Sequence, residues 1–144
     1  MILASPMNFV ANHPINKSEE KYFKLNNINT ERLCKQHDEL VKCLKENGVD
    51  CQFLVNDKKL PEQTFVRDTA FFVDDIIFVC NMKEKIRDKE TKVVEKLFQG
   101  EEYKQYKLIK LKKQIEGGDV VVYGKNVFIG YNPNGNGRTS MGGD

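Results

Sequence analysis

Apolar and polar positions along the chain predict two helices among short strands. The best helix covers residues 30–47, where an apolar stripe follows a 3.6-residue period: Leu33, Leu40, Val41 and Leu44. Asn29 or Thr30 can cap its start, and Gly48 suits the left-handed position at its end. His37 falls in the same stripe, so we expect it to be packed rather than catalytic.

A second helix and several strands follow from the same kind of pattern. Residues 88–99 carry a shorter apolar stripe that stops at Gly100. Apolar runs bounded by turn residues predict seven strands, at residues 2–5, 49–55, 69–73, 76–80, 106–111, 119–123 and 127–131. The resulting order of helices and strands is typical of an α/β fold.

Two predicted hairpins, about fifty residues apart, have the same design. Each consists of two apolar strands around a polar turn, and each has acids just before or at its first strand: Asp68 in one, Glu116 and Asp119 in the other. Between them lie one helix and one strand, so the chain repeats a single supersecondary unit. Acids held at the ends of paired strands suggest a site for a cation. Asp68 could instead cap a strand end, and the glycines after Glu116 are typical of an ordinary turn.

The repeat is not completed within the sequence. The second hairpin should be followed by a helix, but residues 132–144 are rich in Asn and Gly. Strands that are apolar on both faces need covering layers. We therefore expect residues 1–131 to be the first part of a larger fold, with residues 132–144 as a flexible tail or a truncation point. Unpaired strand edges would favour a homo-oligomer.

Charge and composition exclude several classes of partner. The net charge is +2, from 23 basic and 21 acidic residues, which favours neither a nucleic acid nor a membrane surface. No apolar run reaches the ~20 residues that span a bilayer, and the first residues lack the basic start of a signal peptide. The four cysteines lack metal-ligand spacing, so we expect reduced thiols, no metal and a cytoplasmic location.

Three motifs together resemble the guanidine-modifying superfamily, which includes dimethylarginine dimethylaminohydrolase, arginine deiminase and the amidinotransferases. They are Phe65-Val-Arg-Asp68, then Arg87-Asp-Lys-Glu-Thr91, then Glu116-Gly-Gly-Asp119 followed by Arg138-Thr139. Their order and spacing together make the resemblance specific, and it is closest to the dimethylarginine dimethylaminohydrolase branch because the chain is compact and lacks a helical insertion. The resemblance implies a five-bladed α/β propeller built of ββαβ units (a pentein fold), of which this chain would form about the first half.

The resemblance also implies roles for individual residues and an arginine-like small-molecule substrate. Asp68 and Glu116 would bind the guanidinium, and Glu116 would also orient a catalytic histidine. Arg87 and Arg138 would hold the substrate carboxylate, and Asp119 would support the second acidic loop. Glu62 stands where this branch commonly has a substrate-binding aspartate. No metal or organic cofactor is implied.

The chain departs from the family at the reaction centre. The family nucleophile is a cysteine near the end of a longer chain, and its histidine lies in a later blade. Here the two histidines, His13 and His37, both precede the first acidic motif. We therefore expect a substrate-binding part of a guanidine hydrolase that is inactive alone. The alternative is a complete, non-catalytic module of the same fold that binds a cationic ligand or a protein.

Overall fold

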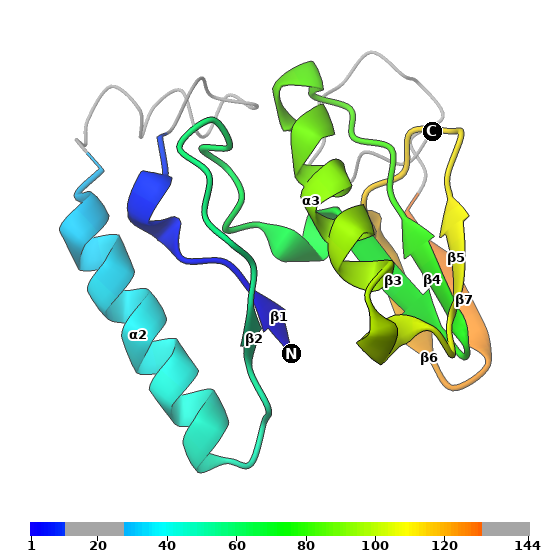
Figure 1. The fold of residues 1–144 in the computed structure, drawn as a ribbon, viewed down its shortest axis with the longest axis horizontal. Coiled ribbons are helices and arrows are strands. Elements are labelled where there is room, and N and C mark those ends of the chain that lie inside the picture. The colour runs from blue at the N-terminus through cyan, green and yellow to red at the C-terminus, as the bar shows by residue number, and fades with distance from the viewer. Residues whose placement is uncertain (11–27, 131–144) are drawn as a thin grey trace. The chain divides into compact units, whose positions relative to one another are not determined.

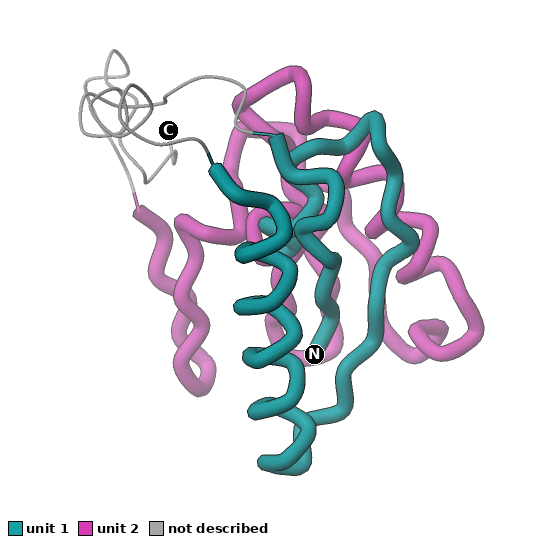
Figure 2. Tube along the Cα trace, turned by 90° about the vertical axis from the view of Figure 1, so that its left-hand side faces the viewer, with its two compact units in different colours: residues 1–66 teal, residues 67–144 magenta. Residues whose placement is uncertain are grey.

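The computed structural model describes residues 1–10 and 28–130, and its contacts group the chain into two compact units. Unit 1 comprises residues 1–66 and unit 2 residues 67–144, as coloured in Figure 2. The predicted tail at residues 132–144 lies outside the described residues, as does most of the long segment before the first helix. The single domain predicted over residues 1–131 stays a prediction.

Unit 1 combines one long helix with two very short parallel strands. Strand β1 (Ile2–Leu3) pairs with β2 (Gln52–Phe53), and a 3₁₀ turn, η1 (Pro6–Asn8), follows β1. The predicted strands at 2–5 and 49–55 are therefore longer than the observed ones. At the first of them the reason is local, because Pro6 opens the 3₁₀ turn and has no N–H for a strand ladder.

Helix α2 (Thr30–Glu46) forms where the sequence predicts it (Figure 1). The Asn29 side chain accepts a hydrogen bond from the backbone N–H of Arg32, and Gly48 has the positive φ of a helix C-terminus. None of its residues is fully buried, and Leu40 of the predicted apolar stripe is 51% exposed. A two-stranded sheet only two residue pairs long offers little surface to cover such a stripe.

Unit 2 begins with a three-stranded sheet covered by a helix (Figure 1). Strands β3 (Ala70–Val73) and β4 (Ile76–Val79) form an antiparallel hairpin, and β5 (Lys107–Lys110) pairs with β4 in parallel. The connection from β4 to β5 runs through η3 (Lys85–Arg87), α3 (Asp88–Phe98) and η4 (Glu101–Tyr103). The core of this unit lies where α3 meets β4, and its members are buried: Ile77, Val79, Val94 and Phe98.

The second hairpin reproduces the first. Strands β6 (Val120–Tyr123) and β7 (Asn126–Ile129) pair in the register of β3 and β4 shifted by 50 residues, since Ala70↔Val79 becomes Val120↔Ile129. The hydrogen bond that closes each hairpin is also repeated at 2.9 Å, from Cys80 N–H to the Thr69 carbonyl and from Gly130 N–H to the Asp119 carbonyl. The predicted repeat is therefore confirmed down to single hydrogen bonds.

The two hairpins differ in how well they are covered. Ile77 and Val79 of β4 are 1% and 0% exposed, whereas Val127 and Ile129 at the equivalent places of β7 are 39% and 50% exposed. Within residues 28–130, only the first hairpin is followed by a helix and a third strand. No helix in the described ranges is long and apolar enough to cross a membrane.

Candidate functional site

Two acidic loops meet in unit 2, and each is a short 3₁₀ turn that leads into a hairpin. Asp68 ends η2 (Val66–Asp68) ahead of β3, and Glu116 precedes η5 (Gly117–Asp119) ahead of β6. Glu116 and Asp119 form a capping box, in which the Asp119 side chain accepts the backbone N–H of Glu116 at 3.4 Å. The second acidic loop is thus held in shape by its own side chains.

Two glycines allow the loops to approach each other. A Cβ on Gly117 would lie 2.0 Å from the backbone oxygen of Arg67, and one on Gly118 would lie 2.6 Å from Oδ1 of Asp68. A side chain at Gly117 would therefore force the loops apart, and one at Gly118 would displace the Asp68 carboxylate. The glycines that sequence reasoning could assign to an ordinary turn are required for close contact between the two acidic motifs.

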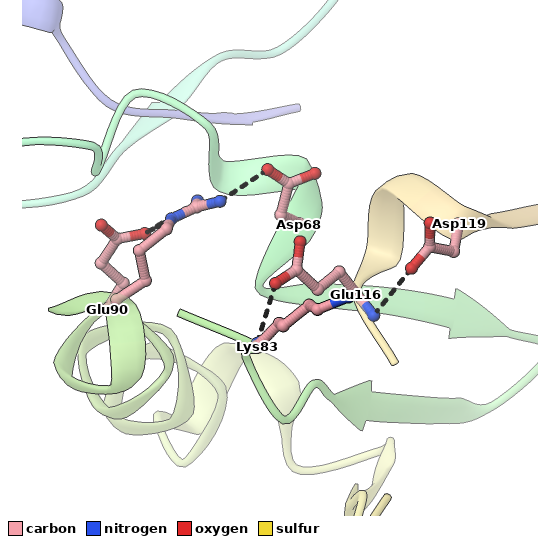
Figure 3. Close-up of polar contacts among 6 residues, drawn as sticks. Asp68, Lys83, Glu90, Glu116 and Asp119 are labelled. Atoms are coloured by element: carbon pink, nitrogen blue, oxygen red, sulfur yellow. Dashed lines mark hydrogen bonds and ion pairs between the residues drawn. The ribbon is translucent and has the colours of Figure 1, made fainter. Parts of the chain in front are cut away.

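Asp68 and Glu116 lie side by side as a result (Figure 3). Oε1 of Glu116 accepts a hydrogen bond of 2.9 Å from the backbone N–H of Lys83. Burial raises the pKa of Glu116 above its ordinary value; the Lys83 hydrogen bond and the charge of Arg87 oppose this rise, and the charges of Asp68 and Asp119 add to it. The carboxylate of Glu116 is therefore incompletely compensated.

Arg87 joins the cluster from the start of α3. Its Nη1 contacts Oδ2 of Asp68 at 2.9 Å, while its Nε and Nη2 contact Oε2 of Glu90 at 3.0 and 2.9 Å. Burial alone would lower the pKa of Arg87, but hydrogen bonds and charge from Glu90 and Asp68 hold it above its ordinary value. The guanidinium is thus a firmly charged partner of two carboxylates.

Cys80 lies at the end of the first hairpin, within reach of the charges of this cluster. Burial, with the charges of Glu116 and Asp68, raises the pKa of its thiol to about 12. Because the thiolate is the nucleophilic form of cysteine, Cys80 is inert near neutral pH. Cys80 is 2% exposed and therefore packs as a small buried side chain.

The acids do not line a surface depression and are not part of a metal-binding group in the described residues. A depression of about 380 Å³ lies between β3 and β6, but its lining includes neither Asp68 nor Glu116. Within the described ranges, no three His, Cys, Asp or Glu side chains are grouped so as to hold a metal ion.

Most of the predicted site residues in unit 2 come together, and one partner was missed. The structure gathers Asp68, Arg87, Glu116 and Asp119. Glu62 belongs to unit 1, and Arg138 lies outside the described residues. Glu90 was not predicted, although an arginine and a glutamate three residues apart at a helix start could have indicated the pair.

The comparisons with known proteins place the chain in the guanidine-modifying superfamily of pentein fold, in agreement with the resemblance. A profile described as "N,N dimethylarginine dimethylhydrolase, eukaryotic" matches residues 5–139, and the chain belongs to this family. It is 32% identical over 130 residues to an uncharacterized protein, YkgA, of Bacillus subtilis strain 168, covering 90% of this chain and 44% of that protein.

Solved structures of low sequence identity share the fold. A mutant of dimethylarginine dimethylaminohydrolase from Pseudomonas aeruginosa, complexed with citrulline, matches with a TM-score of 0.72 and 18% identity over 90% of this chain and 49% of that one. A mutant of AgrE in complex with L-arginine matches with a TM-score of 0.75 and 20% identity over 93% of this chain and 20% of that one. The chain thus spans about half the length of the YkgA and dimethylarginine dimethylaminohydrolase relatives, as a partial ring predicts.

Proposed function

We propose that this chain is the guanidinium-recognising part of a guanidine-hydrolysing enzyme, in which Asp68 and Glu116 grip one flat cation. The observation that carries the proposal is the meeting of the two carboxylates across the glycine contact of their loops. The family membership of the chain gives the class of ligand. A guanidinium is planar and permanently charged, and its N–H donors pair with carboxylates through short, charge-assisted bonds.

The charge of the cluster favours the same ligand. Three carboxylates (Asp68, Glu90 and Glu116) share the charge of Arg87, and the pKa of Glu116 is raised above its ordinary value. A bound cation would compensate the negative charge of the Glu116 carboxylate and would lower the pKa of this group. Such compensation is what makes a partly buried carboxylate tolerable.

Hydrolysis requires more than recognition. Attack on the guanidinium carbon needs a thiolate and a histidine that moves protons. Cys80 interacts electrostatically with Glu116 and Asp68. Its thiol has a pKa of about 12, so it does not supply the thiolate. We therefore propose that this chain binds arginine-like compounds without converting them. In the family reaction, Glu116 would orient the histidine. Water would replace an amine or ammonia at the guanidinium carbon, and citrulline would be the product.

The remaining predicted residues take supporting roles in this proposal. Asp119 fixes the backbone of Glu116 through the capping box. Arg138 remains the proposed ligand of the substrate carboxylate, and the substrate-binding role that the resemblance implies for Glu62 stays a prediction. The alternative is a binding module without any catalytic part. The one observation in its favour is the raised pKa of the Cys80 thiol.

Calorimetry with L-arginine and L-citrulline tests the proposal, because citrulline replaces the guanidinium with a neutral ureido group of similar shape. We expect arginine to bind at least about tenfold more tightly than citrulline, as one charge-assisted hydrogen bond contributes ~1.5–3 kcal/mol. Asp68→Asn should remove this preference, and Asp75→Asn, in the turn of the first hairpin, should leave it unchanged. A colorimetric assay should detect no citrulline formed from arginine. Equal affinities for the two compounds would contradict the proposal.

A further inference from the structure

Arg67 and Gly117 occupy equivalent places in the two repeats, and they are in contact with each other. The 50-residue offset that relates Ala70 to Val120 also relates Arg67 to Gly117. A Cβ on Gly117 would lie 2.0 Å from the backbone oxygen of Arg67, so the two loops are packed backbone to backbone at this point. The same position of the repeat therefore holds a long cationic side chain in one copy and no side chain in the other.

The Arg67 side chain extends from this contact to the first strand of the second hairpin. Its Nη2 donates a hydrogen bond of 3.0 Å to the backbone carbonyl of Val120, the first residue of β6. Because the Gly130 N–H bonds to the Asp119 carbonyl, the backbone groups of the next residue, Val120, point away from β7. Val120 is 2% exposed, and a buried carbonyl requires a donor. Arg67 supplies the donor that β7 does not.

The acidic loop that carries Glu116 is therefore fixed to the first repeat at both of its ends. Just before the loop, Ile115 forms an antiparallel bridge with Asn81, which lies shortly after β4. Just after the loop, Val120 is held by Arg67. Because the capping box ties Glu116 to the end of η5, a shift at Val120 would displace Glu116 as well.

We propose that Arg67 is a positioning residue, which holds the second acidic loop where Glu116 and Asp68 can bind one guanidinium together. This role deepens the proposed function and rests on it. Arg67 acts through Val120, and its side chain does not bind the cation, because two positive charges repel each other. Its guanidinium is directed at a neutral carbonyl, so it holds the loop without neutralising the carboxylate of Glu116.

Two substitutions separate the hydrogen bond of Arg67 from its charge and its bulk. Arg67→Lys keeps the charge and a donor, whereas Arg67→Met keeps an apolar stem but has no donor. Arg67 is exposed, so neither substitution removes a core side chain. Lys125→Met, in the exposed turn of the second hairpin, is the matched control for the loss of one positive charge from unit 2.

Calorimetry with L-arginine measures the effect on binding. Arg67→Met should weaken arginine about tenfold, because a displaced Glu116 loses a charge-assisted bond. Arg67→Lys and Lys125→Met should bind arginine as the wild type does. An unchanged affinity in Arg67→Met, while Asp68→Asn removes the preference for arginine over citrulline, would overturn the inference. An equal loss in Arg67→Lys and Arg67→Met would also overturn it, since a donor at this place would then not be enough.

A measurement without ligand distinguishes a failure of the positioning role from a failure of the proposed function. If the wild-type chain binds neither arginine nor citrulline, the proposed function is rejected, but the seating of Glu116 can still be followed. The titration of its carboxyl carbon is observed by NMR and is assigned with Glu116→Gln.

Burial of Glu116, which raises its pKa, depends on the seating of its loop. In Arg67→Met the pKa of Glu116 should therefore move toward the ordinary glutamate value, and in Arg67→Lys and Lys125→Met it should equal that of the wild type. A wild-type pKa of Glu116 in Arg67→Met would overturn the positioning role, whether or not the chain binds arginine.

Discussion

The position of the Asp68 carboxylate depends on the absence of a side chain at Gly118. A Cβ at Gly118 would stand 2.6 Å from Oδ1 of Asp68, the far end of a side chain that can rotate away. We therefore expect Gly118→Ala to lower arginine affinity about tenfold by displacing one acceptor, with little effect on folding. Calorimetry and urea unfolding of the same protein check both halves of this prediction. A large loss of stability with unchanged affinity would contradict it.

The raised pKa of Glu116 makes binding sensitive to acid. The pKa of an ordinary glutamate is ~4.3, and burial raises that of Glu116. As the pH is lowered, arginine affinity should therefore begin to fall at a pH above the ordinary glutamate pKa, because Glu116 takes up a proton there. Calorimetry at a series of pH values follows this directly. An affinity that stays constant down to the ordinary glutamate pKa would contradict the prediction.

The same pKa has a consequence for stability. A carboxyl whose folded pKa lies above its unfolded value stabilises the fold below the unfolded pKa, and this contribution is lost as the pH rises through the folded pKa. Glu116→Gln should thus melt at a higher temperature than the wild type at pH 7, with a difference that shrinks toward pH 4. Thermal melts across this range measure it. The shift would be contradicted if the gain in melting temperature of Glu116→Gln over the wild type were smaller at pH 7 than at pH 4.

The two hairpins have the same strand register, but their apolar side chains are buried to different extents. Val79 on β4 is fully buried, whereas Ile129, fifty residues later on β7, is half exposed. Val79→Ala should reduce the free energy of unfolding by ~1–3 kcal/mol, and Ile129→Ala by less than ~0.5 kcal/mol. Urea unfolding of both variants provides the measurement. Equal losses would mean that the second hairpin is covered in solution.

The exposed hairpin is also where we expect self-association. Apolar side chains stand out along β6 and β7, among them Phe128 at 60% exposed, and an uncovered apolar edge invites pairing with another copy. The chain should sediment faster than a monomer, and Phe128→Lys should shift it toward the monomer. Val55→Lys, at an 83% exposed position of unit 1, serves as the control. A wild-type chain that sediments as a clean monomer would exclude this surface as an interface.

For the molecule as a whole, the sequence predicted best what is local. The hairpins, α3 and α2 appear close to their predicted bounds because alternation, periodicity and caps are encoded in neighbouring residues. The cover of α2 was not predicted, since exposure of Leu40 depends on what packs against the helix. Glu90 was missed for a similar reason: in a charged run it resembles a solvated residue, and only the fold buries it beside Arg87.

The acids were found in the sequence because they stand at equivalent places of a repeat, but their meeting depends on the fold. Nothing in residues 68 and 116 themselves shows that Gly117 and Gly118 will seat one loop on the other. The resemblance supplied the expectation of a shared site, and the packing of the glycines supplies its physical basis.

The claim that both acids grip one flat cation is tested most directly by a double-mutant cycle. The affinity for methylguanidinium, which is little more than the planar group itself, should be measured for the wild type, Asp68→Asn, Glu116→Gln and the double variant. If both carboxylates bind the same cation, the losses in binding free energy are non-additive, with a coupling of ~0.5–3 kcal/mol. Additive losses, or no loss in either single variant, would contradict the account.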